Sequence, residues 1–259
     1  ATQFIYIENQ YFRWPPLAEL INKIAEEQTS KGRDQNKHGA LYLFVVTNAT
    51  DEGIGSGTVN TQRMLKVLGR ADTIPGITKQ MQIDKLRREA GTTPVSEMYT
   101  PKDVEEFVKK QQELDAKILE IEKSTIVPEP RPGLNIHVCS LVALDSPPDN
   151  WMPVYIHSKL MIVNDVFTTH GSANINTRSM QVDSEMNIAH EWASVTQDLR
   201  RRLWNMHTNG MGSVDDSKSA FDIWKRIISD NDRMMSEKNK PVAPLIGFLY
   251  SKSKLKDWD

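Results

Sequence analysis

An uninterrupted apolar run at residues 40–46 limits the fold of this chain more than any other segment. It has the length of a β-strand, and apolar residues at every position are typical of a strand covered on both faces. A second apolar segment, 4–11, leads into a proline pair and then into leucines and isoleucines at helical spacing. Further strands are expected at 135–144, 154–163 and 184–190. This alternation predicts an α/β domain.

Two long segments lie outside this pattern. Residues 58–123 are predicted to be a largely helical insert within one domain spanning 1–259. Its clearest helix, 103–123, places apolar residues among alternating charges, and we interpret it as an amphipathic packing helix. Residues 213–259 are expected to form a polar tail with a few helical turns. The glycine-rich loop at 51–57 lacks the spacing and lysine of a P-loop, so we expect a mobile connection there.

The predicted strand 154–163 contains two chemically notable residues, His157 and Lys159. Residues two apart in a strand point to the same face, so the imidazole and the ammonium group are expected side by side. Their strand neighbours are mainly apolar, and a histidine and a lysine are costly to bury there without a task. A His-x-Lys pair alone, however, often arises by chance on a solvated strand.

A second polar group follows. Gly171, Ser172 and Asn174 offer a hydroxyl and a side-chain amide that can hydrogen-bond phosphate oxygens, although alone they could form an ordinary turn. Glu185 is expected on a neighbouring strand, where its carboxylate could hold the second nitrogen of His157. Together these residues predict a phosphate pocket with a histidine as nucleophile or proton donor.

This joint pattern resembles the signature of the phospholipase D superfamily, His-x-Lys-x4-Asp-x6-Gly-Ser-x-Asn. The histidine, lysine, glycine, serine and final asparagine match in register. The aspartate does not, because Asn164 stands there and Asp165 follows one residue late. The resemblance implies that this aspartate supports the fold more than the chemistry, and that Glu185 orients the histidine.

The opening segment Ile5–Phe12 is similar to an element of lipid-cleaving phospholipases D, which implies substrate-binding roles for Asn9 and Gln10. The match to the signature implies the same role for Gly171. Its simpler interpretation is a core strand that ends in a polar turn. The segments 168–172 and 179–185 add a narrower similarity, to phospholipase D-type lipase effectors of bacterial type VI secretion. That similarity implies an effector delivered to a target-cell periplasm or a host cell, with an immunity protein and a secretion-spike protein as partners.

The resemblance also implies a mixed β-sheet flanked by helices and a mechanism that needs no cofactor and no metal. One histidine forms a phosphohistidine, and a second histidine, from another copy of the motif, protonates the leaving alcohol. Of the six histidines only His157 has a lysine two residues later, so we expect this chain to be one catalytic half. The other half would be a second copy of the chain or an N-terminal half, which the abrupt start at Ala1 favours.

Composition limits the partners. A net charge of −2 argues against a broad nucleic-acid-binding surface, and no apolar stretch is long enough to cross a bilayer, so a peripheral contact with membrane phospholipid is expected. The single cysteine, Cys139, lies in an apolar run and is predicted to be buried. Two competing functions remain open at this point: a nuclease using the same pocket, and a phosphate-binding pseudo-enzyme with Asn164 as its mark.

Overall fold

A computed structural model describes residues 1–34, 39–91 and 100–257. Its centre is a mixed sheet whose eight described strands run in the order β4-β3-β2-β1-β5-β6-β7, with β8 paired to β3. The strands are β1 Phe4–Asn9, β2 Leu41–Val46, β3 Leu134–Val142, β4 Pro153–Val154, β5 Lys159–Val163, β6 Phe167–Gly171, β7 Asn187–His190 and β8 Leu245–Gly247. The predicted α/β class and the mixed sheet flanked by helices are confirmed.

Three parallel strands, β1, β2 and β3, form the middle of the sheet, and β5 joins β1 in the antiparallel direction. Every residue of β1 and β2 is buried, as the continuous apolar sequence of β2 predicted for that strand. Parallel strands end at the same edge, so the polar residues that follow β1 and β2 lie together at one rim of the sheet. The start of β5 meets the end of β1 there, because Lys159 pairs with Asn9.

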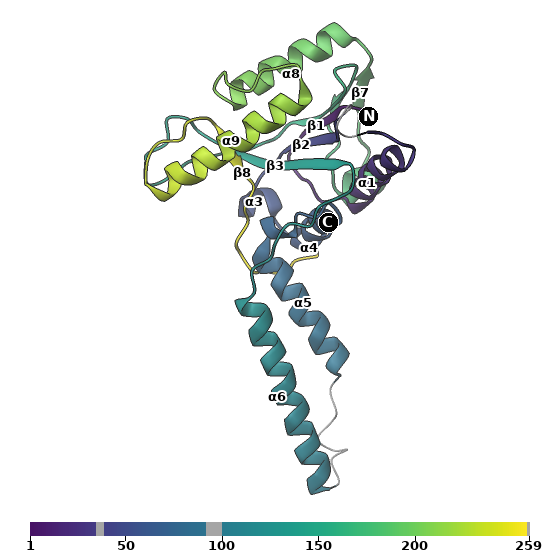
Figure 1. Ribbon diagram of the computed structural model, residues 1–259, viewed down its shortest axis with the longest axis vertical. Helices are drawn as coiled ribbons and strands as arrows, with labels where there is room; N and C mark the ends of the chain where they lie inside the picture. Colours follow the sequence, from purple (N-terminus) through teal and green to yellow (C-terminus); the bar gives the residue numbers. More distant parts are fainter. Residues whose placement is uncertain (35–38, 92–99, 258–259) are drawn as a thin grey trace.

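Helices cover both faces of the sheet (Figure 1). Helices α8 and α9 pack on one face, and α1 and α4 pack on the other. The described helices are α1 Pro15–Ser30, α3 Asp51–Ile54, α4 Thr58–Val67, the 3-10 turn η1 Ala71–Thr73, α5 Pro75–Ala90, α6 Pro101–Lys123, α7 Thr177–Gln181, α8 Ala193–His207 and α9 Ser217–Ser236. The glycine-rich loop at 51–57, expected to be a mobile connection, contains α3.

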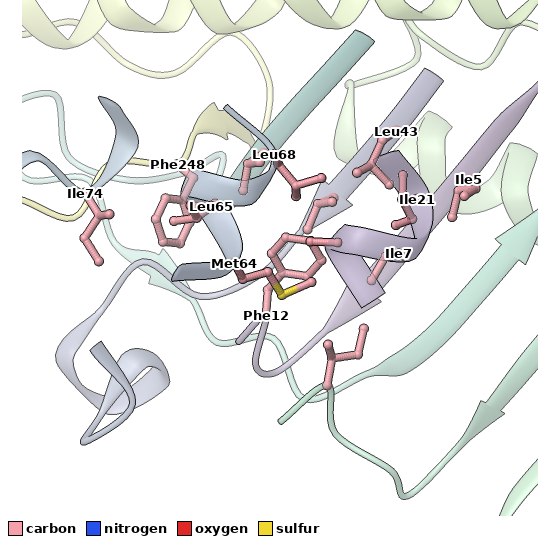
Figure 2. Packing of buried hydrophobic residues seen from close by; sticks show 14 of the residues in the cluster. Ile5, Ile7, Phe12, Ile21, Leu43, Met64, Leu65, Leu68, Ile74 and Phe248 are labelled. Atoms are coloured by element: carbon pink, nitrogen blue, oxygen red, sulfur yellow. The ribbon is translucent and has the colours of Figure 1, made fainter. Parts of the chain in front are cut away.

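The core beneath α1 and α4 is mainly aliphatic, with Phe12, Phe248 and Tyr250 as its aromatic members. Alternate residues of β1 and β2, including Ile5, Ile7 and Leu43, pack against Ile21 of α1 and Met64 of α4 (Figure 2). Only alternate residues of each strand contribute to this core, because successive side chains of a strand point to opposite faces of the sheet.

The opposite core is aromatic and lies beneath α8 and α9. Trp204 of α8 packs on Phe44 of β2 with ring centroids 4.6 Å apart, and Trp224 of α9 lies 5.0 Å from the same ring. Both tryptophans are almost completely buried. Cys139 is buried in the same cluster, as its apolar surroundings predicted.

The segment 213–259 is therefore more than the polar tail that was expected. It supplies α9, whose buried face includes Ala220, Trp224 and Ile227, and the strand β8. The expectation was wrong because the spacing of these three residues, at i, i+4 and i+7, is a helical core pattern hidden among many charges.

The helix predicted at 103–123 exists, and the partner against which it packs is α5. Helix α6 begins with a capping box between Thr100 and Asp103, and none of its residues is buried. It contacts α5, and the two helices project away from the sheet as a hairpin (Figure 1). The amphipathic pattern is real, but its apolar face meets one helix instead of a core. Residues 92–99 of the predicted insert lie outside the described residues.

Among the helices that the structure describes, none combines the length and the apolar composition that a bilayer crossing requires.

Candidate active site

The site lies where β1 ends and β5 begins. The strand predicted at 154–163 is in fact two strands, β4 and β5, and residues 155–158 between them belong to neither. Lys159 is the first residue of β5, whereas His157 lies outside the sheet with an exposed side chain. The placement of both residues within one strand was therefore wrong, because the pairing of β5 with β1 begins only at Lys159.

Lys159 is held by two oxygen acceptors. Its ammonium group donates to the side-chain oxygen of Gln10 at 2.9 Å and to the backbone oxygen of His157 at 2.7 Å. Partial burial lowers the pKa of Lys159, and the nearby carboxylate of Glu185 opposes that effect. The two acceptors thus hold the ammonium group of Lys159 beside His157, with the Glu185 carboxylate nearby.

Gln10 joins the lysine to the segment that carries the histidine. While its oxygen accepts from Lys159, its amide nitrogen donates to the hydroxyl of Tyr155 at 2.9 Å. The rings of Tyr155 and His157 are nearly parallel, with centroids 6.5 Å apart. The side chain of Gln10 is therefore engaged within the protein, and its expected contact with substrate stays a prediction.

The irregular segment before β5 has a second anchor, which the sequence analysis missed. Asn48, just after β2, accepts from the backbone nitrogen of Ile156 at 2.7 Å and donates to its oxygen at 2.8 Å. It also donates to the backbone oxygen of Gln10 at 3.0 Å. One buried amide thus replaces the missing ladder bonds beside His157, over a sequence separation that no local pattern reveals.

Ser172 and Glu185 are brought together on the loops that flank β6 and β7. The serine hydroxyl donates to the Glu185 carboxylate at 2.5 Å and accepts from the backbone nitrogen of Met186 at 3.0 Å. The bond from Ser172 is the main cause that lowers the pKa of Glu185, and Lys159 contributes to the same shift. No hydrogen bond joins Glu185 to the His157 ring within the described residues. The histidine-orienting role of Glu185 therefore stays a prediction.

Gly171 has a packing reason to be glycine. A Cβ at this position would lie 2.2 Å from the backbone oxygen of Met186, a clash that no rotamer can relieve. The close approach of β6 and β7 that it permits lets Ser172 reach Met186. Its predicted contact with substrate is untested.

Asn9 is buried and ties the end of β1 to the loop that follows Ser172. Its side-chain oxygen accepts from the backbone nitrogen of Ile175 at 3.1 Å and from that of Tyr11 at 3.2 Å. In the same loop, the side-chain oxygen of Asn174 is buried and has no hydrogen-bond partner among the described residues. Asn9 thus positions the loop, while Asn174 presents an unsatisfied acceptor.

Asn164, the departure from the family signature, has a structural task. Its side-chain oxygen accepts from the backbone nitrogens of Thr2, Gln3 and Phe4 at 3.2, 2.9 and 3.1 Å. It therefore caps the start of β1, at the far end of β5 from the site. This agrees with the fold-supporting role that the resemblance implied for the aspartate. The following residue, Asp165, pairs with the buried Arg200.

The arrangement combines an exposed imidazole, a fixed ammonium group, a hydroxyl and a carboxylate. Such a set can hold a phosphate group by charge and hydrogen bonds while a histidine exchanges a covalent bond or a proton. Among the residues that the structure describes, no group of three or more His, Cys, Asp or Glu side chains could hold a metal ion.

Comparison with known proteins agrees with this arrangement. The domain family described as "Cardiolipin synthase, PLD-like domain" matches residues 131–207, which include His157, Ser172 and Glu185. Phospholipase D alpha 4 of Arabidopsis thaliana is 43% identical over 74 residues, which are 26% of this chain and 10% of the relative.

Longer matches extend over most of the chain. Phospholipase D gamma 1 of the same plant is 28% identical over 201 residues, covering 73% of this chain and 22% of the relative. Phospholipase D delta is 28% identical over 255 residues, covering 88% of this chain and 26% of the relative. The chain thus spans about a tenth to a quarter of the length of these three relatives. The motif, the fold and these matches together support placing the chain in the phospholipase D superfamily.

Proposed function

We propose that this chain is one catalytic half of a phospholipase D-type phosphodiesterase, which cleaves the distal phosphodiester of glycerophospholipids to give phosphatidate. One observation carries the proposal: the ammonium group of Lys159 is fixed 2.7 Å from the backbone of an exposed histidine, His157, at the rim of the sheet. The names of the matched relatives, phospholipases D from a plant, support the choice of substrate class.

The proposed reaction is a two-step displacement at phosphorus. A histidine of the second motif attacks and forms a phosphohistidine, and His157 gives a proton to the departing alcohol. His157 then takes a proton from water, or from another alcohol, as that molecule displaces the phosphohistidine. Lys159 and the donors of the Ser172 loop offset the charge that builds on the phosphoryl oxygens.

The site needs a second His-x-Lys motif, and this sequence holds only one. Two features support a partner that completes it. The side-chain oxygen of Asn174 is buried without a hydrogen-bond partner among the described residues, which costs free energy unless a bound group satisfies it. Solvent-exposed apolar side chains flank Glu185, including Val182, which is 75% exposed, and Met186, which is 79% exposed. A second lobe would cover them.

The proposal is tested with vesicles of phosphatidylethanolamine and a primary alcohol, using mass spectrometry to detect the phosphatidyl alcohol. The chain is assayed alone and together with a lobe that carries its own His-x-Lys motif. We expect product in at least one assembly, and its loss with His157→Ala or Lys159→Ala. His170→Ala is the matched control, because His170 is also exposed but lies outside the motif.

Product from the chain alone would mean that two copies complete one site. Product only with the added lobe would make the chain half of a two-part enzyme. No product in either assembly would contradict the proposal. Cleavage of single-stranded DNA in place of lipid would indicate the nuclease, and phosphate binding without turnover would indicate the pseudo-enzyme.

We further infer an antibacterial role with delivery by type VI secretion, supported only by the sequence segments 168–172 and 179–185. The corresponding partners would be an immunity protein and a secretion-spike protein. Expression of the complete assembly in the periplasm of a test bacterium checks this role. Growth arrest that requires His157 is the expected result, and normal growth with active enzyme would contradict it.

A further inference from the structure

A buried carboxylate lies directly behind the reactive tripeptide at residues 157–159. Glu8 of β1 points into the aromatic core beneath α8 and α9, together with Phe4 and Tyr6 of the same strand. Burying an ionised carboxylate among aromatic rings is costly unless several donors satisfy it. Its presence here therefore calls for an explanation.

Three donors meet at this carboxylate. One oxygen of Glu8 accepts from the hydroxyl of Tyr6 at 2.6 Å and faces a ring nitrogen of His207 at 2.8 Å. The other oxygen accepts from the hydroxyl of Ser158. The side chains of Glu8 and His207 are 8% and 4% exposed, so water hardly competes for these bonds.

Ser158 is the residue between His157 and Lys159. Its backbone oxygen accepts from the backbone nitrogen of Gln10 at 3.1 Å, and its side chain is held by Glu8. Because residues 155–158 lie outside the strands, these bonds and those of Asn48 take the place of a ladder. The direction in which His157 points thus depends on how firmly Ser158 is held.

We propose that Glu8 and His207 are positioning residues, which hold Ser158 from the core side and thereby aim His157 and Lys159 toward the phosphate. The last residue of α8 is His207, so the proposal connects the aromatic core to the geometry of the site. The expected effect on turnover rests on the proposed function, whereas the expected support of Ser158 does not.

The structural arm of the test needs no activity. Hydrogen exchange is measured by NMR at the amide of Gln10, whose acceptor is Ser158, and at Leu43 and Val138 in the middle strands. In Ser158→Ala and His207→Ala we expect exchange at Gln10 to become at least about ten times faster, with little change in β2 and β3. His207→Gln keeps a side-chain donor and should restore most of the protection.

The kinetic arm uses the complete assembly. Ser158→Ala and His207→Ala should lower kcat about tenfold or more while KM stays within about twofold. A misoriented His157 reduces the stabilisation of the transition state more than it reduces the affinity for substrate. His207→Gln should recover much of the loss. The matched control is Thr196→Val, which removes another buried bond between α8 and the sheet, 2.7 Å long to Thr168, away from the motif. It should leave kcat unchanged.

Two results would overturn the proposal. Unchanged exchange at Gln10 in Ser158→Ala and His207→Ala would show that Ser158 needs no such support. Equal acceleration at Gln10, Leu43 and Val138 would show a role in the whole core instead of one at the site. If the wild-type assembly has no turnover, the proposed function fails, and hydrogen exchange still decides whether Glu8 and His207 position the tripeptide.

Discussion

The ammonium group of Lys159 and the side-chain oxygen of Gln10 lie 2.9 Å apart, although 149 residues separate them in the sequence. The bond joins the end of β1 to the start of β5. It connects two segments that resemble phospholipases D, because Gln10 belongs to the opening element and Lys159 to the His-x-Lys motif.

This bond predicts different outcomes for two substitutions of Gln10. Gln10→Glu places a carboxylate on Lys159 that competes with the phosphate for the lysine charge, so kcat/KM should fall about 10- to 100-fold. Gln10→Ala removes an anchor but leaves the charge available, so its loss should be several times smaller. Steady-state assays on the complete assembly compare the two, and a larger loss in Gln10→Ala would contradict this role.

The cap that Asn164 provides for β1 predicts a stability effect. Asn164→Gly removes the acceptor of three backbone nitrogens while tolerating the left-handed conformation, φ 53°, and should cost about 1–3 kcal/mol. Asn164→Asp should be nearly neutral, because a carboxylate accepts the same three bonds. Urea unfolding measures both. An Asn164→Asp loss as large as that of Asn164→Gly would refute the capping account.

The sequence predicted the central strands and the α/β class, because these depend on local apolar runs. The candidate site residues come from motif spacing, and their roles stay predictions. The sequence could not predict the anchors of the irregular segment before β5. Asn48 reaches Ile156 across 108 residues, and His207 reaches Glu8 across 199. Such contacts are decided by how the layers pack, for which the local sequence carries no signal.

The surroundings of helices α6 and α9 could not be predicted for a different reason. Periodicity shows that a helix has an apolar face, but it does not show what covers that face. Helix α6 contacts α5 in a projecting hairpin, whereas α9 completes the aromatic core through Trp224. The spacing of the apolar residues in 217–236 is typical of a helix with one buried face, but no pattern in α6 predicts its exposure.

His137 predicts a pH dependence of stability. Burial lowers its pKa to about 4, and its ring stacks on Phe221 with centroids 3.7 Å apart. The unfolded chain binds a proton below about pH 6.5, the ordinary histidine value, while the folded chain does not until about pH 4. The contribution of the neutral, buried His137 to the free energy of unfolding is therefore fully present above about pH 6.5, and it is lost as the pH falls toward 4.

The test compares wild type with His137→Gln, which does not titrate. The advantage of wild type in the free energy of unfolding should shrink by at most about 3 kcal/mol between pH 7 and pH 4. Chemical denaturation at several pH values measures it. If the difference in the free energy of unfolding between the two proteins does not change with pH, the pH dependence assigned to His137 is wrong.

The aromatic core predicts that the segment 213–259 is required for folding. Trp224→Ala should cost about 3–5 kcal/mol, because it opens a large cavity beside Phe44 and Trp204. Trp192→Ala is the matched control: with 68% exposure, its loss should change stability by less than about 1 kcal/mol. Thermal unfolding of both variants gives the comparison. A small effect of Trp224→Ala would mean that α9 is dispensable.

The most direct test of the account concerns the role of His157 as the acid for the leaving group. Wild type and His157→Ala, each assembled with a separate lobe that supplies the attacking histidine, are given two phosphatidyl esters that differ only in the leaving group, ethanolamine or nitrophenol. We predict that His157→Ala loses at least about a thousandfold in kcat on the ethanolamine ester and much less on the nitrophenyl ester, whose leaving group needs no proton. Near-normal turnover of the ethanolamine ester by His157→Ala would contradict the account.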